Sequence, residues 1–106
     1  MSLPDGRSLA YTDVGGPNSP LLVYFHGAPT SRLDLALLEH ALAGVDVRVV
    51  APDRPGYGGS SPRAGPRLED WPSDVTALAT YLAAGRFAVM GWSSGGPYAV
   101  VCAALL

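Results

Sequence analysis

The chain has 106 residues, of which 48% are hydrophobic and 15% are charged, and its net charge is −2. This composition predicts one packed domain, because enough apolar surface can be buried to offset the entropy lost on ordering. The seven basic residues are all arginines spread along the chain, which disfavours a nucleic-acid partner, and the lack of lysine excludes P-loop and Schiff-base chemistry.

No segment has the pattern of an export signal or a membrane span. The N-terminal residues lack the apolar stretch of a signal peptide, and no run reaches the roughly 18 apolar residues that a membrane-spanning helix needs. We therefore expect a cytoplasmic protein without a membrane partner. The single cysteine, Cys102, lies in an apolar segment, which predicts a buried and unreactive thiol.

Four segments predict β-strands. Residues 7–14 follow an Asp-Gly turn signal and alternate apolar with polar side chains, as an antiparallel strand with one exposed face does. Residues 21–25, 45–51 and 87–90 are rich in apolar or β-branched side chains, which is typical of strands covered on both faces. The unbroken run at 21–25 is the expected centre of a parallel sheet.

Helical spacing of apolar residues appears between these runs. Residues 33–43 predict an amphipathic helix that ends at a cap formed by Gly44. Its apolar stripe consists of Leu33, Leu37, Leu38, Ala41 and Leu42. A second stripe, which stops before Gly85, consists of Trp71, Val75, Leu78 and Leu82. The alternation of strands and helices predicts an α/β fold with a mostly parallel sheet, helices on both faces and an antiparallel N-terminal edge.

Residues 91–95, Gly-Trp-Ser-Ser-Gly, fit the pattern Gly-x-Ser-x-Gly between a predicted strand and a predicted apolar helix. A serine in this context stands on a sharp turn with its hydroxyl exposed, so Ser93 is the candidate nucleophile. The turn needs neighbours without bulk, which Gly91, Gly95 and Gly96 provide. Trp92 either borders an acyl pocket or packs against the fold.

Two backbone N–H groups are expected to form an oxyanion hole, which stabilises the negative charge that develops when Ser93 attacks a carbonyl. The helix after Ser93 directs its free N–H groups and the positive end of its dipole toward that charge, and the N–H of Ser94 comes first. The second donor is expected from Ala28, which follows the central strand, because Gly27 permits an unusual turn there.

Three motifs together resemble those of α/β-hydrolase fold enzymes. They are His-Gly-Ala-Pro at 26–29, Asp-Arg-Pro-Gly-Tyr-Gly-Gly-Ser at 53–60 and Gly-Trp-Ser-Ser-Gly-Gly at 91–96, in the family's order and spacing. The chain is similar in particular to bacterial hydrolases of the proline-iminopeptidase, esterase and lactonase type, over nearly its whole length.

This resemblance implies a serine-dependent hydrolase of ester, lactone or amide bonds that acts on a small acyl substrate through an acyl-enzyme. It implies neither a metal ion nor an organic cofactor. In the family the base follows the nucleophile, which assigns His26 to organising the oxyanion loop, although the base role stays open. The segment 53–60 is expected to shape its loop through structural hydrogen bonds of Asp53 and Arg54.

Residues 94–106 contain no Asp, Glu or His, although the family order is Ser, then acid, then His. Residues 1–106 are therefore expected to be the amino-terminal, nucleophile-bearing part of a single domain whose C-terminal part is absent. Alone, this part is expected to be nearly inactive, because a serine hydroxyl without a base is a weak nucleophile. The open edge of the strand at 87–90 predicts self-association.

Two other interpretations stay open. The missing acid and base favour a non-catalytic fragment or interaction module that retains the fold. A nucleotide-binding domain is weaker, because Ser61 stands where the third glycine of Gly-x-Gly-x-x-Gly would follow Gly56 and Gly58, and no helix is expected to begin there.

Overall fold

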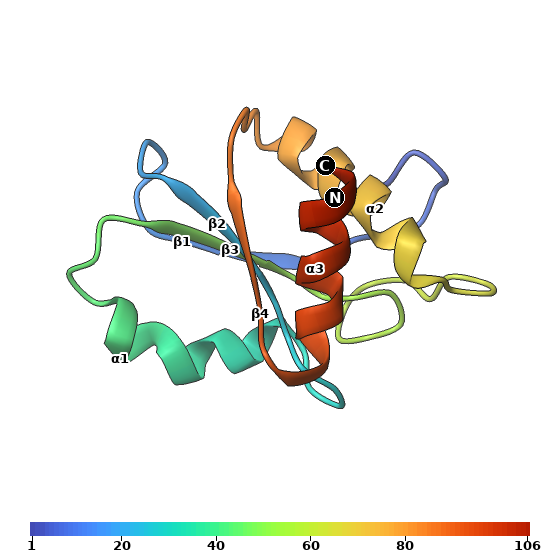
Figure 1. Ribbon diagram of the computed structural model, residues 1–106, viewed down its shortest axis with the longest axis horizontal. Helices are drawn as coiled ribbons and strands as arrows, with labels where there is room; N and C mark the ends of the chain where they lie inside the picture. Colours follow the sequence, from blue (N-terminus) through green and yellow to red (C-terminus); the bar gives the residue numbers. More distant parts are fainter.

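The computed structural model describes all 106 residues and contains one four-stranded sheet with helices packed on it (Figure 1). The strands are β1 (Tyr11–Val14), β2 (Leu21–Phe25), β3 (Arg48–Pro52) and β4 (Ala88–Gly91). Their order in the sheet is β1-β3-β2-β4. Strands β2, β3 and β4 are parallel, and β1 pairs antiparallel with β3, which confirms the predicted sheet.

Strand β2 divides two apolar cores, because successive side chains of a strand point to opposite faces. The larger core lies between the sheet and the helices α2 (Trp71–Tyr81) and α3 (Gly96–Leu105). Its buried members from these elements are Leu21, Val23, Phe25, Val50, Trp71, Val75, Leu78 and Cys102. On the other face Tyr24 packs against Leu35. The sheet is therefore covered on both faces, as predicted.

The helical segment between β2 and β3 differs from the predicted amphipathic helix. It is a 3₁₀ helix over Arg32–Leu38 that continues into a short α-helix, α1 (Glu39–Leu42). Leu33 and Leu37 are 66% and 80% exposed, so their place in the predicted buried stripe was wrong. Leu35 is buried instead, and Leu38 packs beside it, because a 3₁₀ helix has three residues per turn.

Helix α2 buries the first three members of the predicted stripe, and Leu82 packs at its edge. The helix ends at Tyr81, earlier than predicted, because Ala83 adopts a left-handed backbone with a φ of +55°. The N–H groups of Ala83 and Ala84 then donate to the carbonyls of Thr80 and Ala79, which terminates the helix.

The predicted N-terminal strand is shorter in the structure and begins at Tyr11. The preceding residue, Ala10, donates its N–H to the side chain of Ser60 rather than to a neighbouring strand. Before it, Arg7 forms an ion pair with Asp74 of α2, with N–O distances of 2.7 and 3.1 Å. This pair ties the N-terminal segment to α2.

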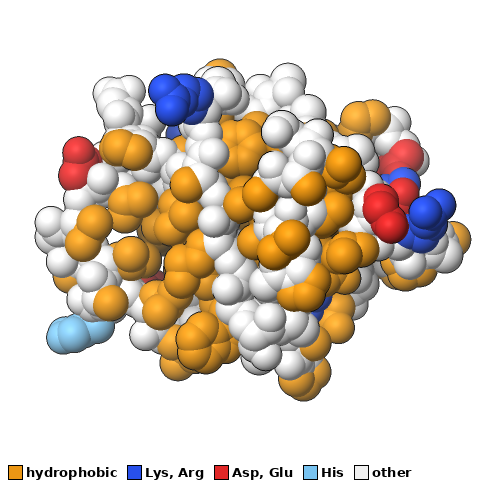
Figure 2. All heavy atoms as spheres, in the orientation of Figure 1, with side chains coloured by type: hydrophobic (Ala, Val, Ile, Leu, Met, Phe, Trp, Pro, Cys, Tyr) orange, Lys and Arg blue, Asp and Glu red, His pale blue; other side chains and the backbone are white.

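Strand β4 forms one edge of the sheet, so the backbone groups on its outer side have no strand partner. Apolar side chains gather over β4 and α3 on this face (Figure 2). The exposed ones include Met90, Val100, Leu105 and Leu106. Self-association through this edge stays a prediction. No helix combines the length with the apolar character that crossing a membrane requires.

Candidate active site

Ser93 lies on the turn that joins β4 to α3. Its φ is +52°, in the left-handed region that residues other than glycine rarely adopt. A 3₁₀ turn over Ser93–Gly95 leads directly into α3, and the side chain of Ser93 is exposed. A strained, exposed serine between a strand and a helix is the local geometry of a nucleophile elbow.

Two of the three glycines around Ser93 are required by close backbone approach. A Cβ on Gly91 would lie within 3.0 Å of the carbonyl oxygen of Gly95, and one on Gly95 would overlap the carbonyl oxygen of Phe25. A Cβ on Gly96 would meet nothing within 4 Å. The expectation that Gly96 must lack bulk is therefore wrong, because its Cβ position faces open space at the start of α3.

The loop after β2 packs directly on this turn. A Cβ on Gly27 would lie 3.2 Å from Cδ1 of Trp92 and 3.4 Å from Cβ of Ser93. The N–H of Gly27 donates to the Asp34 carboxylate at 3.3 Å, and the hydroxyl of Thr30 donates to the same carboxylate at 2.9 Å. Asp34 thus fixes the loop through hydrogen bonds to Gly27 and Thr30. Nothing in the sequence indicated this role, because the carboxylate comes from the following helical segment.

His26 is fully buried, and both of its ring nitrogens are hydrogen-bonded to backbone groups. Nε2 lies 3.0 Å from the amide nitrogen of Arg54, and Nδ1 lies 2.8 Å from the carbonyl oxygen of Gly27. Because an amide N–H can only donate, Nε2 accepts and the proton is on Nδ1. Burial lowers the pKa of His26. The imidazole therefore joins the ends of β2 and β3 as a neutral ring and has no free lone pair for Ser93.

The other histidine, His40, is exposed on α1, across the sheet from α3. Within residues 1–106 neither histidine is therefore placed to take a proton from Ser93. No group of three or more His, Cys, Asp or Glu side chains could hold a metal ion. Cys102 is buried, and burial raises the pKa of its thiol to about 11, as expected for an unreactive cysteine.

The two predicted oxyanion donors, Ala28 and Ser94, are neighbours in the structure. The N–H of Ala28 donates to Oγ of Ser94 at 2.7 Å. This contact brings the loop after β2 against the turn that carries Ser93. The N–H of Ala28 is therefore engaged by the Ser94 hydroxyl, a relationship that the sequence did not indicate.

Structural hydrogen bonds were expected of Arg54, but the sequence did not indicate which groups surround its side chain. Only 3% of Arg54 is exposed, and its guanidinium carbon lies 4.9 Å and 4.4 Å from the ring centroids of Tyr57 and Tyr98. Nη2 lies 3.2 Å from Oγ of Ser94. Tyr57 follows three residues after Arg54, but Tyr98 comes from α3, so no local pattern predicts this arrangement.

Asp53 makes the structural hydrogen bonds that were expected of it. Its buried carboxylate accepts from the N–H groups of Arg32 and Gly59, at 2.6 and 2.8 Å, and pairs with the Arg32 guanidinium. A Cβ on Gly58 would overlap this carboxylate. The glycine-rich loop is thus folded around an acidic side chain, which is unfavourable for holding a phosphate and argues against the nucleotide-binding interpretation.

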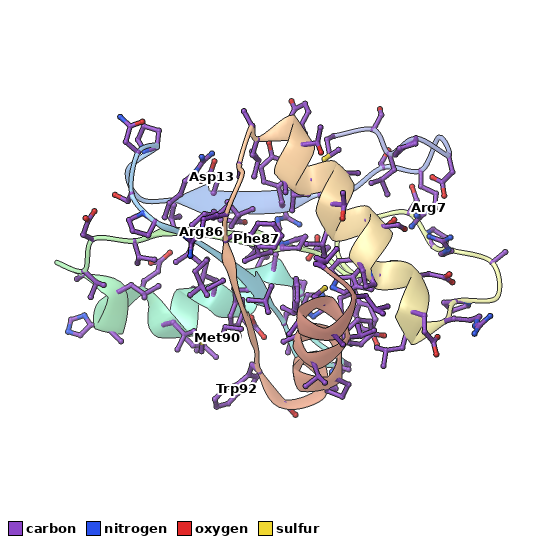
Figure 3. All side chains as sticks on the ribbon, turned by 45° about the horizontal axis from the view of Figure 1, so that its top comes forward. Arg7, Asp13, Arg86, Phe87, Met90 and Trp92 are labelled. Atoms are coloured by element: carbon purple, nitrogen blue, oxygen red, sulfur yellow. The ribbon has the colours of Figure 1, made fainter.

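Trp92 is 56% exposed and points away from the body of the molecule beside the turn (Figure 3). This exposure contradicts packing in the core. The indole ring lies next to Gly27, so Trp92 is at the rim of the candidate site.

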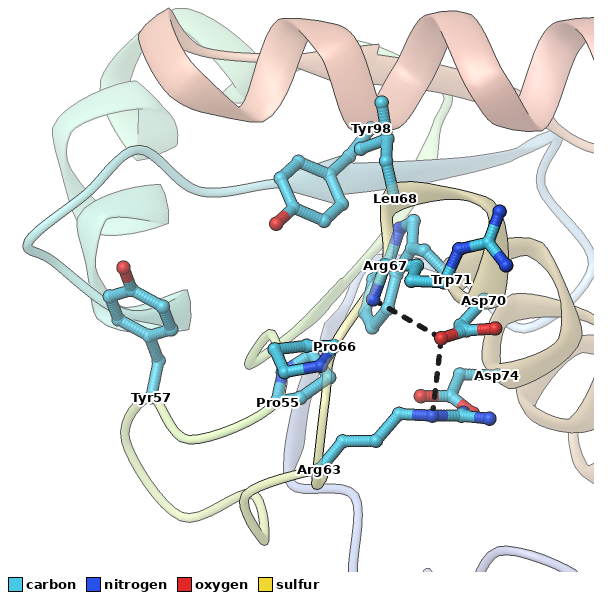
Figure 4. Close-up of a pocket in the computed structure, with 10 residues that line it drawn as sticks. All are labelled: Pro55, Tyr57, Arg63, Pro66, Arg67, Leu68, Asp70, Trp71, Asp74 and Tyr98. Carbon is cyan, nitrogen blue, oxygen red and sulfur yellow. Dashed lines mark hydrogen bonds and ion pairs between the residues drawn. The ribbon is translucent and has the colours of Figure 1, made fainter.

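A pocket of about 250 Å³ lies nearby, and Tyr57 and Tyr98 form part of its wall (Figure 4). The charged side chains around it are Arg63, Arg67, Asp70 and Asp74. Ser93 does not line this pocket. The pocket therefore touches the aromatic pair that flanks Arg54 and not the candidate nucleophile.

Known proteins resemble this chain in sequence over most of its length. A sequence model described as the alpha/beta hydrolase family matches residues 22–106. A bifunctional esterase/perhydrolase of Acinetobacter calcoaceticus is 32% identical over 97 residues, which cover 91% of this chain and 35% of that protein. The chain thus spans about a third of the length of the curated relatives it matches.

Solved structures resemble the fold over almost the whole chain. A carboxylesterase structure from Nitrososphaera gargenis has a TM-score of 0.86 at 26% identity, covering 98% of this chain and 39% of that one. An epoxide hydrolase from an endophytic Streptomyces has a TM-score of 0.82 at 29% identity, covering 99% of this chain and 32% of that one. With its sheet order, its Gly-x-Ser-x-Gly turn and these matches, the chain belongs to the alpha/beta hydrolase family.

Proposed function

We propose that this chain supplies the nucleophile and the oxyanion-binding loop of a serine hydrolase that cleaves ester, lactone or amide bonds of small acyl substrates. The observation that carries the proposal is the backbone of Ser93, held at a φ of +52° on the turn between β4 and α3 with the Ala28 loop against it. Such strain persists only where the surrounding structure enforces it, and it is typical of active sites.

In the proposed reaction Oγ of Ser93 attacks the carbonyl carbon and loses its proton to a base. The negative oxygen that forms is stabilised at the start of α3 by the N–H of Ser94 and by the Ala28 loop. The leaving group departs with a proton, and water then hydrolyses the acyl-enzyme ester. Since neither His26 nor His40 is placed to act on Ser93, the base and its acid come from outside residues 1–106.

The nature of the nucleophile selects among the reactions of the similar proteins, which include epoxide hydrolases. Attack of a serine oxygen on an epoxide carbon would form an ether. An ether has no carbonyl group that water can attack, so the enzyme would stay alkylated. Attack on an acyl carbon forms an ester, which water can cleave. Ser93 therefore favours acyl substrates.

The test uses the gene product that contains residues 1–106, a fluorophosphonate probe and p-nitrophenyl esters of short acids. We expect covalent labelling at Ser93 and ester hydrolysis, and we expect both to be lost in Ser93→Ala. Ser2→Ala, at an exposed position far along the chain from the turn, is the matched control and should keep both.

Hydrolysis that survives Ser93→Ala would contradict the proposal. Absence of both labelling and hydrolysis in a folded gene product, over a broad set of esters, lactones and amides, would instead favour the non-catalytic interpretation.

A further inference from the structure

The hydroxyl of Ser94 is placed to donate its proton outward. A serine hydroxyl has one proton to donate and two lone pairs that accept. The N–H of Ala28 donates to Oγ at 2.7 Å, and Nη2 of Arg54 donates to it at 3.2 Å. These two donors use both lone pairs, and no acceptor within the chain receives the hydroxyl proton. The O–H is therefore free for a group that arrives at the turn beside Ser93.

Arg54 brings a positive charge to this hydroxyl without a carboxylate partner. Burying a charge without a counter-charge is unfavourable, and Arg54 is 97% buried with no acidic oxygen of the chain within 4.0 Å of its guanidinium. The faces of Tyr57 and Tyr98 hold it by cation–π contact. Its other polar contact is Nη1 to the carbonyl oxygen of Ser94, at 3.5 Å. Every hydrogen bond of the guanidinium is therefore made to Ser94.

We propose that the Ser94 hydroxyl is a further hydrogen-bond donor to the substrate oxyanion, and that Arg54 is a positioning residue that orients and polarises it. This inference rests on the proposed function of Ser93. As the carbonyl oxygen becomes negative, Oγ–H and the N–H of Ser94 donate to it together. The Ala28 N–H acts through Oγ rather than directly, and the Arg54 charge, one hydrogen bond behind, strengthens the donor in a partly buried site.

The hydrogen bond between the Ala28 N–H and Oγ of Ser94 also allows the opposite interpretation, in which Oγ blocks the oxyanion position. If Oγ of Ser94 merely occupies the place of the oxyanion, removing it would free the Ala28 N–H for the substrate. Ser94→Ala would then raise the kcat for ester hydrolysis or leave it unchanged. If the hydroxyl is a donor, Ser94→Ala lowers kcat by roughly 100-fold at a similar KM, as loss of one oxyanion donor does elsewhere.

A pair of matched substrates separates a donor from a structural residue. Sulfur accepts hydrogen bonds poorly, so an ester and its thionoester, which carries sulfur in place of the carbonyl oxygen, differ in how much an oxyanion donor helps them. We expect the ratio of ester to thionoester kcat to fall in Ser94→Ala and to recover in Ser94→Thr, which keeps the hydroxyl. A purely structural loss would lower both rates equally and leave the ratio unchanged.

Arg54 is tested in the same gene product with Arg54→Met and Arg54→Lys. We expect Arg54→Met to lower kcat and the ratio, and to have little further effect when Ser94 is already alanine, because Arg54 acts through that hydroxyl. Arg54→Lys keeps the charge and replaces the methionine variant if that variant does not fold. It should lower the ratio of ester to thionoester kcat less than Arg54→Met does. Additive losses in the double variant would overturn the role of Arg54.

Ser93→Ala is assayed beside these variants to separate two failures. If hydrolysis and fluorophosphonate labelling are unaffected by Ser93→Ala, the proposed function itself fails. If Ser93→Ala abolishes both but Ser94→Ala leaves kcat and the ratio unchanged, only the inference about Ser94 and Arg54 fails.

Discussion

The N–H of Ala28 donates a 2.7 Å hydrogen bond to Oγ of Ser94, across 66 positions of the sequence. Through this contact the loop after β2 is held against the turn that carries Ser93. The turn, the loop and the buried His26 therefore form one packed unit at the carboxyl end of the parallel strands, where open α/β sheets bind their ligands.

The two glycines that follow Ser94 are expected to respond differently to alanine. Gly95→Ala places a Cβ onto the carbonyl oxygens of Phe25 and His26, so it should lower the free energy of unfolding by about 3 kcal/mol or more. Gly96→Ala meets open space in a helical backbone and should change it by less than about 1 kcal/mol. Urea unfolding of both variants measures the difference. Equal losses would show that the elbow is not packed as described.

The buried His26 predicts a pH dependence of stability. Burial lowers its pKa below the ordinary value of 6.5, so the unfolded chain takes up a proton at a higher pH than the folded chain does. The free energy of unfolding should be fully developed above about pH 6.5 and should fall as the pH drops toward the lowered pKa of the folded state.

Urea unfolding from pH 5 to 8, roughly the range in which histidine titrates, tests this dependence. His26→Gln should reduce the stability at neutral pH and flatten its pH dependence. His40→Gln, at an exposed position, should leave both unchanged. If the slope persists in His26→Gln, another group is responsible for it.

The left-handed backbone at Ala83 is expected to be a site of stabilisation. Alanine is unfavourable at a φ of +55°, whereas glycine adopts it readily, so Ala83→Gly should raise the free energy of unfolding by about 0.5–1 kcal/mol. The same change at Ala77, inside α2, should lower it by about 1 kcal/mol. Thermal unfolding of the two variants compares them directly, and a loss at both positions would contradict the described end of α2.

The ion pair between Arg7 and Asp74 is expected to stabilise the N-terminal segment. The side chains of Arg7 and Asp74 are only 13% and 5% exposed, so Asp74→Ala leaves a mostly buried guanidinium with Asp5, which is 48% exposed, as its remaining ion-pair partner. The change should reduce stability by about 2 kcal/mol. The exposed pair between Arg67 and Glu69 is the control, and Glu69→Ala should have no measurable effect. Similar values for the two variants in urea unfolding would show that the Arg7 pair is solvent-screened.

Local patterns were sufficient for the elements and for the turn at Ser93. The apolar run of β2, the stripe of α2 and the approach of Gly91 to Gly95 involve neighbours within a few positions, so periodicity and bulk report them directly. The Gly-x-Ser-x-Gly pattern indicated a glycine at 95, whose close contacts are with the distant carbonyls of Phe25 and His26. The segment before α1 was predicted less well. Its leucines fit an α-helical stripe equally well, and only packing against the sheet selected the 3₁₀ turn that buries Leu35.

The sequence by itself determined that an α/β sheet would present Ser93 on a sharp turn. Strand alternation, helical spacing and the glycines around Ser93 are patterns among residues that are close in sequence. Only the tertiary structure decided what surrounds that turn. Arg54 reaches Ser94 across 40 positions, and it is held there by an aromatic ring from its own loop and another from α3. Such contacts depend on how β3 and α3 pack. Hydrogen bonds between side chains that are distant in sequence produce no periodic pattern from which they could be predicted.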